Sequence, residues 1–371
     1  MTLSRRELLA GAGAGAAALW LVGCGDETPE EVAVGPVDGR WWMPAEEDAH
    51  EVTWMCLPRR TDVWGRDLPA VQQTIADIAV TIAAFEPVRI LVHPDDLGLA
   101  RDLMGSDVEQ LEAPVDDLWA RDTLPLFLVD GSGGLAAGRV RFNGWGDKQV
   151  HAGDATLAGV VADILGVELV DPGVVGEGGG IEVDGEGSLL AARSSWVNDN
   201  RNPGWTEAEI GDTLVALLGA ERMLWVDGIA GQDITDGHID TLARFTEPGT
   251  LIHELPSYVE PGETWYDVAV DTEAALRRFR TLDGEPYELI TLRQPAAPRG
   301  TGDEFLASYV NYYVCNGGVI IPEFGDEAAD AAAAEQIGAA YPGREIVALD
   351  IDPVSAGGGG IHCATQQQPA V

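Results

Sequence analysis

From residue 41 to the C-terminus, short apolar runs alternate with segments of helical periodicity. The run from Val88 to His93 is typical of a buried strand, and in the segment before it, 69–85, apolar residues recur on one helical face. This alternation predicts an α/β fold. No second linker interrupts the pattern, so we expect residues 41–371 to form one domain.

The strand and helix signals recur at a spacing that suggests a β-rich α/β unit repeated about five times. Segments 181–183 and 188–192 flank the turn sequence Asp-Gly-Glu-Gly and predict a β-hairpin. Thr206 is a candidate N-cap for a helix that ends near Leu218, with acidic residues in its first turn. A doubly wound parallel sheet would fit the alternation nearly as well, but the hairpins favour mixed, largely antiparallel pairing.

Residues 1–24 have the pattern of an export signal. Twin arginines at positions 5 and 6 precede a Gly/Ala-rich apolar stretch that ends near Leu21, which is short for a membrane span. We interpret the segment as a twin-arginine signal. It runs into a sequence resembling a bacterial lipobox, in which Cys24 would be lipidated; the alternative is a free cysteine after an ordinary cleavage site. Residues 25–40 are then a tether, and we expect an exported protein held in the cell envelope by a lipid anchor on Cys24.

The chain carries 62 acidic residues against 22 Lys and Arg, a formal net charge of −40. Because 46% of its residues are hydrophobic, this is the composition of an acidic globular protein rather than a disordered one. Such a charge repels nucleic acid and attracts small cations, so we exclude a nucleic-acid partner. Adaptation to high salt is the alternative explanation of the acidity. We interpret Lys148, the only lysine, as a member of a structural ion pair.

Three cysteines remain beyond the signal: Cys56, Cys315 and Cys363. An odd number in an exported protein argues against a disulfide framework and for at least one reactive thiol. Cys56 and Cys315 lie in apolar, strand-like runs, which favours a packing role. No Cys/His cluster has zinc-like spacing, so we expect neither a metal nor a cofactor.

Cys363 follows a run of four glycines that ends at Gly360. Glycines let the backbone approach a ligand closely, which suits a nucleophile, although a cysteine near glycines is more often a small core residue. If Ile239 points into the core from a strand, His238 and Asp240 share the opposite face. A histidine beside a carboxylate suits a general acid/base paired with a cation-binding group. The alternative is a surface loop with a solvated histidine.

Two further segments suit a cationic ligand. Trp119 and Asp122 lie in a turn-like stretch, where the ring can stack and the carboxylate can neutralise charge. Glu177 precedes a glycine run. Taken singly, each of these segments is also compatible with an ordinary turn.

The chain from Trp41 to Pro369 resembles the agmatine deiminases of the guanidine-modifying (pentein) superfamily, also called the Porphyromonas-type peptidylarginine deiminases. The resemblance rests on motifs that occur in the family's order at 43–46 (MPAE), 119–123 (WARDT), 142–146 (FNGWG), 177–179 (EGG), 200–203 (NRNP), 235–240 (TDGHID), 307–311 (ASYVN) and 361–363 (IHC). It implies a five-bladed α/β propeller with a central active site, and a possible homo-oligomer.

By this resemblance Cys363 corresponds to the catalytic nucleophile and His238 to the general acid/base. Asp122 and Asp240 correspond to the carboxylates that hold the guanidinium nitrogens, and Glu177 to the acid that orients the histidine.

Trp119 corresponds to a residue that packs beside the substrate, and we place Gly360 among the substrate-binding residues. The implied reaction is hydrolysis of the guanidinium of agmatine to N-carbamoylputrescine and ammonia, a step of putrescine biosynthesis, through a covalent thiouronium on Cys363.

Three departures from the family pattern bear on the substrate. The family is usually cytosolic, Leu124 stands where glycine is common, and Ile234 stands where some members carry an acid that meets the substrate's far amine. Two other functions therefore stay open. One is an exported deiminase of peptidylarginine or free arginine, and the other is a non-catalytic lipoprotein that binds guanidines or polyamines.

Overall fold

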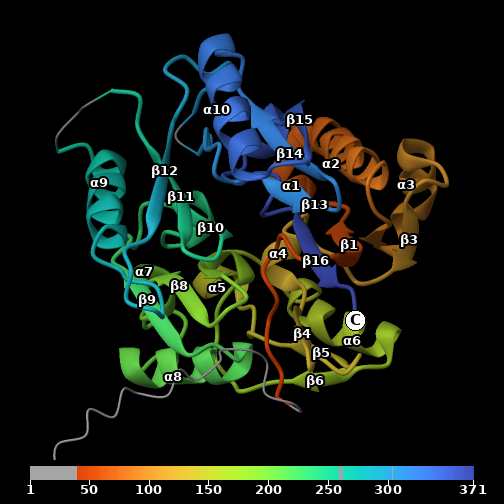
Figure 1. Cartoon of the computed structure of the whole chain (residues 1–371). Coiled ribbons are helices and arrows are strands. Elements are labelled where there is room, and N and C mark those ends of the chain that lie inside the picture. The colour runs from red at the N-terminus through yellow and green to blue at the C-terminus, as the bar shows by residue number, and fades with distance from the viewer. Residues whose placement is uncertain (1–39, 259–261, 303) are drawn as a thin grey trace, which may run out of the picture. The chain divides into compact units, whose positions relative to one another are not determined.

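The computed structural model describes residues 40–258, 262–302 and 304–371 (Figure 1). The expected export signal and lipobox at 1–24, and the tether up to residue 39, lie outside the described residues. Within those residues the strands form five small sheets, one of four strands and four of three. Helices connect the strands throughout, which confirms the α/β class. In the same residues, we find no helix with the length and apolarity that crossing a membrane requires.

Four of the sheets share one order of elements: two antiparallel strands, a helix, and a third strand parallel to the second. The first two units comprise β4 (Leu126–Val129), β5 (Leu135–Gly138), α6 (Leu157–Leu165) and β6 (Glu168–Val170), then β7 (Ile181–Val183), β8 (Ser188–Ala192), α8 (Glu207–Leu218) and β9 (Arg222–Val226). The next two comprise β10 (Ala243–Glu247), β11 (Thr250–Leu255), α9 (Thr264–Leu276) and β12 (Glu288–Arg293), then β13 (Tyr313–Cys315), β14 (Gly318–Glu323), α10 (Glu327–Ala340) and β15 (Glu345–Asp350). The pairing is mixed, as the hairpins indicated, but the expectation of largely antiparallel pairing is wrong: of the eleven strand pairs in the described residues, six are parallel, because each hairpin is followed by a helix that returns the chain to a parallel strand.

The fifth sheet joins the two ends of the described chain (Figure 1). Its strand β16 (Thr365–Pro369) pairs antiparallel with β1 (His50–Cys56), and the indole of Trp54 donates to Gln368 at 3.0 Å. The sheet continues with β2 (Val88–Val92) and β3 (Glu109–Glu112), which are both parallel to β1. Helix α2 (Leu68–Ala83) connects β1 to β2, and α3 (Leu97–Met104) connects β2 to β3. Because Cys363 lies two residues before β16, this pairing fixes the position of the cysteine.

Short helical turns link these units. They are α1 (Thr61–Trp64), η1 (Gly65–Asp67), η2 (Pro94–Asp96), α4 (Ala120–Thr123), α5 (Gly144–Asp147), η3 (Asp154–Thr156), η4 (Gly178–Gly180), α7 (Arg193–Trp196), η5 (Ile239–Thr241) and α11 (Asp352–Ser355). Several of them carry the polar residues of the site described below.

Local sequence signals explain several of the elements. The predicted hairpin is β7–β8, in which the Asp184 carboxylate accepts the backbone N–H groups of Glu186 and Ser188, and Gly185 has a φ of +70°. The Thr206 hydroxyl accepts from the backbone of Glu209, whose carboxylate accepts in return from Thr206, forming a capping box.

The helix predicted at 69–85 is α2, and its apolar residues Val71, Ile75, Ile78 and Ile82 are all buried. They pack in the same core cluster as Ile90 of β2. Burying side chains of this size contributes about 1.5–3 kcal/mol each. The apolar stripe therefore fixes which face of the helix meets the sheet.

The apolar, strand-like run that ends at Cys315 starts at Tyr309, but strand β13 begins only at Tyr313. Tyr309, Val310 and Tyr312 are buried, which explains the apolar pattern. However, the backbone N–H of Tyr309 donates to the side chain of Glu254 at 2.8 Å instead of joining a strand ladder.

Candidate active site

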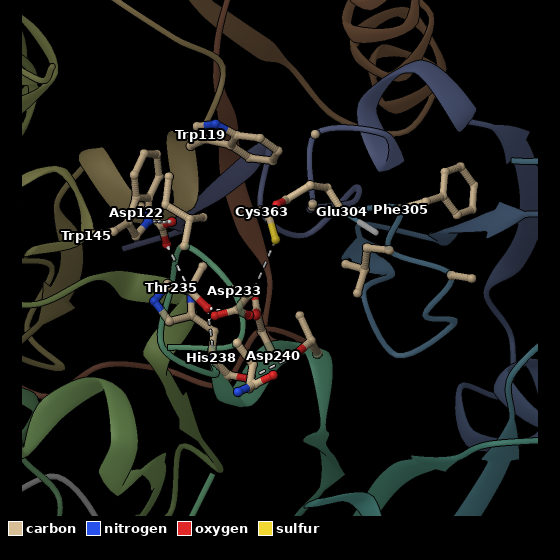
Figure 2. A pocket seen from close by; sticks show the side chains of 18 of the residues that line it. Trp119, Asp122, Trp145, Asp233, Thr235, His238, Asp240, Glu304, Phe305 and Cys363 are labelled. Atoms are coloured by element: carbon tan, nitrogen blue, oxygen red, sulfur yellow. Dashed lines mark hydrogen bonds and ion pairs between the residues drawn. The ribbon is translucent and has the colours of Figure 1, made fainter. Parts of the chain in front are cut away.

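A cavity of about 290 Å³ collects most of the residues singled out in the sequence (Figure 2). Its lining includes Trp119, Asp122, His238, Asp240 and Cys363, which come from segments far apart in the chain. Figure 2 shows the sulfur of Cys363 pointing toward the carboxylate of Asp240, with the Trp119 ring on the opposite side.

Glu177 and Gly360 lie behind this lining. Glu177 is fully buried and reaches the site through the ring of His238. Gly357, Gly358 and Gly359 line the cavity, whereas Gly360 does not and is buried instead. The backbone N–H of Gly360 is close enough to the Cys363 thiol to lower its pKa slightly, against the larger effect of burial.

Cys363 is buried and is held by Asn311 on two sides. The Asn311 amide Nδ2 lies 3.2 Å from Sγ, and its Oδ1 accepts the backbone N–H of Cys363 at 3.3 Å. The sulfur also lies 3.5 Å from Asp240 Oδ2. Burial, followed by the nearby carboxylates of Asp240 and Asp122, raises the pKa of the Cys363 thiol well above its ordinary value. A cation bound in the cavity would oppose both effects and favour the thiolate.

The expectation of a strand that carries His238 and Asp240 on one face is wrong. His238 is the N-cap of η5, and Asp240 lies inside this short 3-10 helix. The preceding turn is tight, since Asp236 and Gly237 both have positive φ, at 63° and 84°. Both side chains nevertheless reach the cavity, because the turn and the helix bring them to the same side.

His238 is surrounded by carboxylates. Its Nε2 lies 3.3 Å from Glu177 Oε2, and its Nδ1 lies 3.8 Å from Asp122 Oδ1. Burial opposes protonation of the ring, but Asp122, Glu177 and Asp240 outweigh it and raise the pKa of His238 to about 9. The imidazole is therefore protonated at neutral pH and able to act as an acid.

Asp122 and Asp240 present carboxylates to the cavity. Asp122 accepts from the Trp145 indole and the backbone N–H of Gly179, both at 3.0 Å, and burial raises its pKa to about 6. For Asp240, burial is outweighed by His362, and its pKa is lowered. Oδ1 of Asp240 has no hydrogen-bond partner in the described part of the chain. It can therefore accept an N–H group of a ligand.

A buried ion-pair network supports Glu177. Arg201 Nε donates to Glu177 Oε1 and Arg201 Nη1 donates to Asp236 Oδ2, both at 2.8 Å. Lys148 Nζ lies 2.7 Å from the same Asp236 oxygen, as expected of a structural ion pair. Burial opposes ionisation, but His238 and Arg201 keep the pKa of Glu177 below its usual value.

Sequence reasoning gave no role to four residues that shape the site: Trp145, Arg201, Asn311 and His362. The first three lie inside the family motifs at 142–146, 200–203 and 307–311. The motifs therefore marked these residues, but a motif does not predict which side chains its residues contact. His362 adjoins Cys363 in the sequence, and its ring contacts Asp240 and Glu46.

A thiol, an imidazole and two carboxylates around one cavity are the groups that nucleophilic hydrolysis of a carbon–nitrogen bond requires. Residues 42–369 match the model of the Porphyromonas-type peptidyl-arginine deiminases, and the chain belongs to this family. A Streptomyces avermitilis protein named "Putative agmatine deiminase" is 36% identical over 340 residues, which cover 88% of this chain and 96% of that protein.

Two solved structures are similar over nearly the same range. The agmatine deiminase of Enterococcus faecalis has a TM-score of 0.83 at 28% identity, covering 89% of this chain and 96% of the other. The agmatine deiminase of C. jejuni with substrate bound has a TM-score of 0.78 at 25% identity, covering 88% and 96%. Fold and family therefore agree along the described chain.

Proposed function

We propose that this protein hydrolyses the guanidinium group of agmatine, releasing N-carbamoylputrescine and ammonia through a covalent thiouronium on Cys363. The observation that carries the proposal is the grouping of the Cys363 thiol, the His238 imidazole and two carboxylates around one cavity. Guanidinium is planar and resonance-stabilised, so its carbon resists water but accepts a positioned thiolate.

Asp122 and Asp240 hold the guanidinium in charge-assisted hydrogen bonds and expose its carbon to Cys363. The bound positive charge lowers the pKa of the thiol, which is otherwise raised by burial and by the same carboxylates. The thiolate forms a carbon–sulfur bond, and His238 gives its proton to the departing nitrogen as the carbon–nitrogen bond breaks. Ammonia leaves, and a thiouronium remains on Cys363.

The now neutral His238 takes a proton from water, whose oxygen attacks the thiouronium carbon. The carbon–sulfur bond breaks, the remaining hydroxyl proton passes to solvent, and the neutral ureido product leaves with the thiolate and the protonated His238 restored. Glu177 holds the ring through Nε2 in both steps.

Agmatine is favoured over free arginine by the charge of the cavity. Its described lining contains no Arg or Lys that could pair with the α-carboxylate of an amino acid. The solved relatives from E. faecalis and C. jejuni are agmatine deiminases. A peptidylarginine substrate, which lacks a free α-carboxylate, is the second candidate, since the family model bears that name.

Ammonia release from agmatine, free arginine and an arginyl peptide tests the proposal, with Cys363→Ala as the control. We expect agmatine to be turned over fastest. Faster turnover of the peptide would contradict the substrate assignment. Tight guanidine binding without ammonia release from any of the three would support a non-catalytic binding lipoprotein instead.

We also propose that the five sheets are the blades of a five-bladed propeller. The shared order of elements in four sheets, and the joining of the chain ends in the fifth, support this arrangement.

Export by the twin-arginine pathway and a lipid on Cys24 remain proposals from the sequence of residues 1–24. Metabolic labelling with a fatty acid, compared in the Cys24→Ala variant, tests the anchor. Assembly into homo-oligomers is likewise proposed, and sedimentation tests it.

A further inference from the structure

The cavity extends well beyond the residues that act on a guanidinium. Its lining also includes Leu242, Glu254 of β11, Trp265 and Ala269 of α9, and Gln294 after β12. Leu242, Trp265 and Ala269 are apolar, whereas Glu254 and Gln294 are polar. This combination suits a ligand tail that has an apolar spacer and a polar end.

Apart from His238, the ionisable side chains that carry charge in the described lining of this cavity are all acidic. The described lining contains no Arg or Lys and five acidic residues: Asp122, Asp233, Asp240, Glu254 and Glu304. Two of these, Asp122 and Asp240, serve the guanidinium. Low-dielectric walls concentrate such a field, so a tail with a second positive charge is favoured and a carboxylate tail is repelled.

The three remaining acids are not equivalent. The Asp233 carboxylate accepts from the Thr235 hydroxyl and the backbone N–H of Gly237, both at 3.0 Å, and these bonds stabilise the turn before His238. Glu304 lines the cavity but is exposed, so water screens its charge. Glu254 is only 4% exposed.

Glu254 is a buried carboxyl with neutral partners. It accepts from the backbone N–H of Tyr309 at 2.8 Å and from the Gln294 amide at 3.2 Å, and the described residues that stabilise its charge include no cation. A buried carboxylate without a countercharge is unfavourable, and a bound ammonium group would remove that cost.

We propose that these residues form a second cation site of the cavity, in which Glu254 binds the ammonium group of a substrate whose guanidinium lies against Cys363. The inference rests on the proposed function and deepens it. It assigns the substrate class as guanidino compounds that carry a terminal amine on an apolar spacer packed against Leu242 and Trp265. Burial raises the pKa of Glu254 to about 7, and a bound ammonium would lower it and favour the ionised pair.

The test compares amine-ended with methyl-ended guanidines of equal chain length, such as agmatine and pentylguanidine, together with homologues that have longer methylene spacers. Calorimetry on the Cys363→Ala variant gives the ratio of dissociation constants within each pair without any turnover. We expect a clear preference for the amine-ended ligand at the best spacer. In Cys363→Ala combined with Glu254→Gln, this preference should fall about 10- to 100-fold, because a hydrogen bond to a charged group is lost.

Two control variants localise the effect. Glu304→Gln removes the exposed carboxylate of the cavity lining, and Glu335→Gln removes an exposed carboxylate on α10, outside the lining. Both should keep the amine preference. Loss of the preference in Glu304→Gln, or its survival in Glu254→Gln, would overturn the proposal.

Binding of the methyl-ended guanidine shows that each variant is folded. If Glu254→Gln fails this check, Glu254→Asp replaces it: the shorter carboxylate should weaken the amine preference, and an unchanged preference would overturn the proposal. Failure of the proposed function is seen separately, as absence of ammonia release by the unmodified enzyme. The second cation site is judged by binding alone.

Discussion

Nδ1 of His362 lies 2.8 Å from Oδ2 of Asp240 and donates a hydrogen bond to it. The other ring nitrogen of His362 lies 2.9 Å from Glu46 Oε2, and Glu46 is in turn paired with Arg121 and Arg244. The residue next to the proposed nucleophile thus connects a substrate-binding carboxylate to a buried ionic network. His362 is a positioning residue, since it acts through Asp240.

Replacing His362 by Gln tests this connection. His362 helps to lower the pKa of Asp240, so its loss should raise that pKa. Asp122, whose pKa is about 6, sets the acid limb of the unmodified enzyme, so additional protonation of Asp240 in the variant should make kcat/KM fall more steeply and from a higher pH. A pH profile measures the shift. A uniform loss of activity without a shifted acid limb would show that His362 only supports the structure.

On the alkaline side, the pH dependence should follow His238. The carboxylates around the ring raise its pKa from 6.5 to about 9, so the ring keeps its proton below that range and loses it as the pH rises through about 9. The departing nitrogen then has no acid, and kcat/KM should fall above pH about 9. A profile that already falls near pH 6.5 would contradict this assignment.

Glu177→Gln should shift the alkaline fall of kcat/KM to lower pH. Removing the carboxylate at Nε2 takes away one of the charges that raise the pKa of His238, so kcat/KM should start to fall at a lower pH than in the unmodified enzyme. A limb that stays in place, with activity reduced at every pH, would mean that Glu177 does not set the protonation of the ring.

The glycine loop before Cys363 offers a structural prediction. A Cβ added at Gly359 would overlap the Trp119 ring, so Gly359→Ala should displace this wall of the cavity. Overpacking typically costs about 1–3 kcal/mol of stability; if the displaced Trp119 ring passes this cost to substrate binding, KM rises about 5- to 150-fold. Gly98→Ala is the matched control, because a Cβ there meets no heavy atom within 4 Å. An unchanged KM in Gly359→Ala would mean that Trp119 does not position the substrate.

The parts of the fold predicted well from sequence depend on neighbours in the chain. The β7–β8 hairpin and the Thr206 cap are examples, since each is stabilised within a few residues. The strand expected at His238 was wrong because alternation cannot detect a tight turn, which Asp236 enters with positive φ. Local patterns also cannot show which distant side chains meet.

The contacts around Cys363 illustrate this limit. Asn311 is 52 positions from Cys363, and the motif that contains it gave no indication that its amide reaches the sulfur. Trp145 and Asp122 are 23 positions apart and meet only in the folded chain. The resemblance brought the proposed catalytic residues together in advance, whereas their supporting partners required the three-dimensional structure.

The covalent step at Cys363 is tested most directly by quenching the enzyme with acid during turnover of agmatine and measuring the mass of the intact protein. The account predicts an added mass equal to agmatine less ammonia, located on the peptide that contains Cys363. It also predicts that Cys363→Ala shows neither the adduct nor ammonia release. Ammonia release by Cys363→Ala at the rate of the unmodified enzyme would contradict the account.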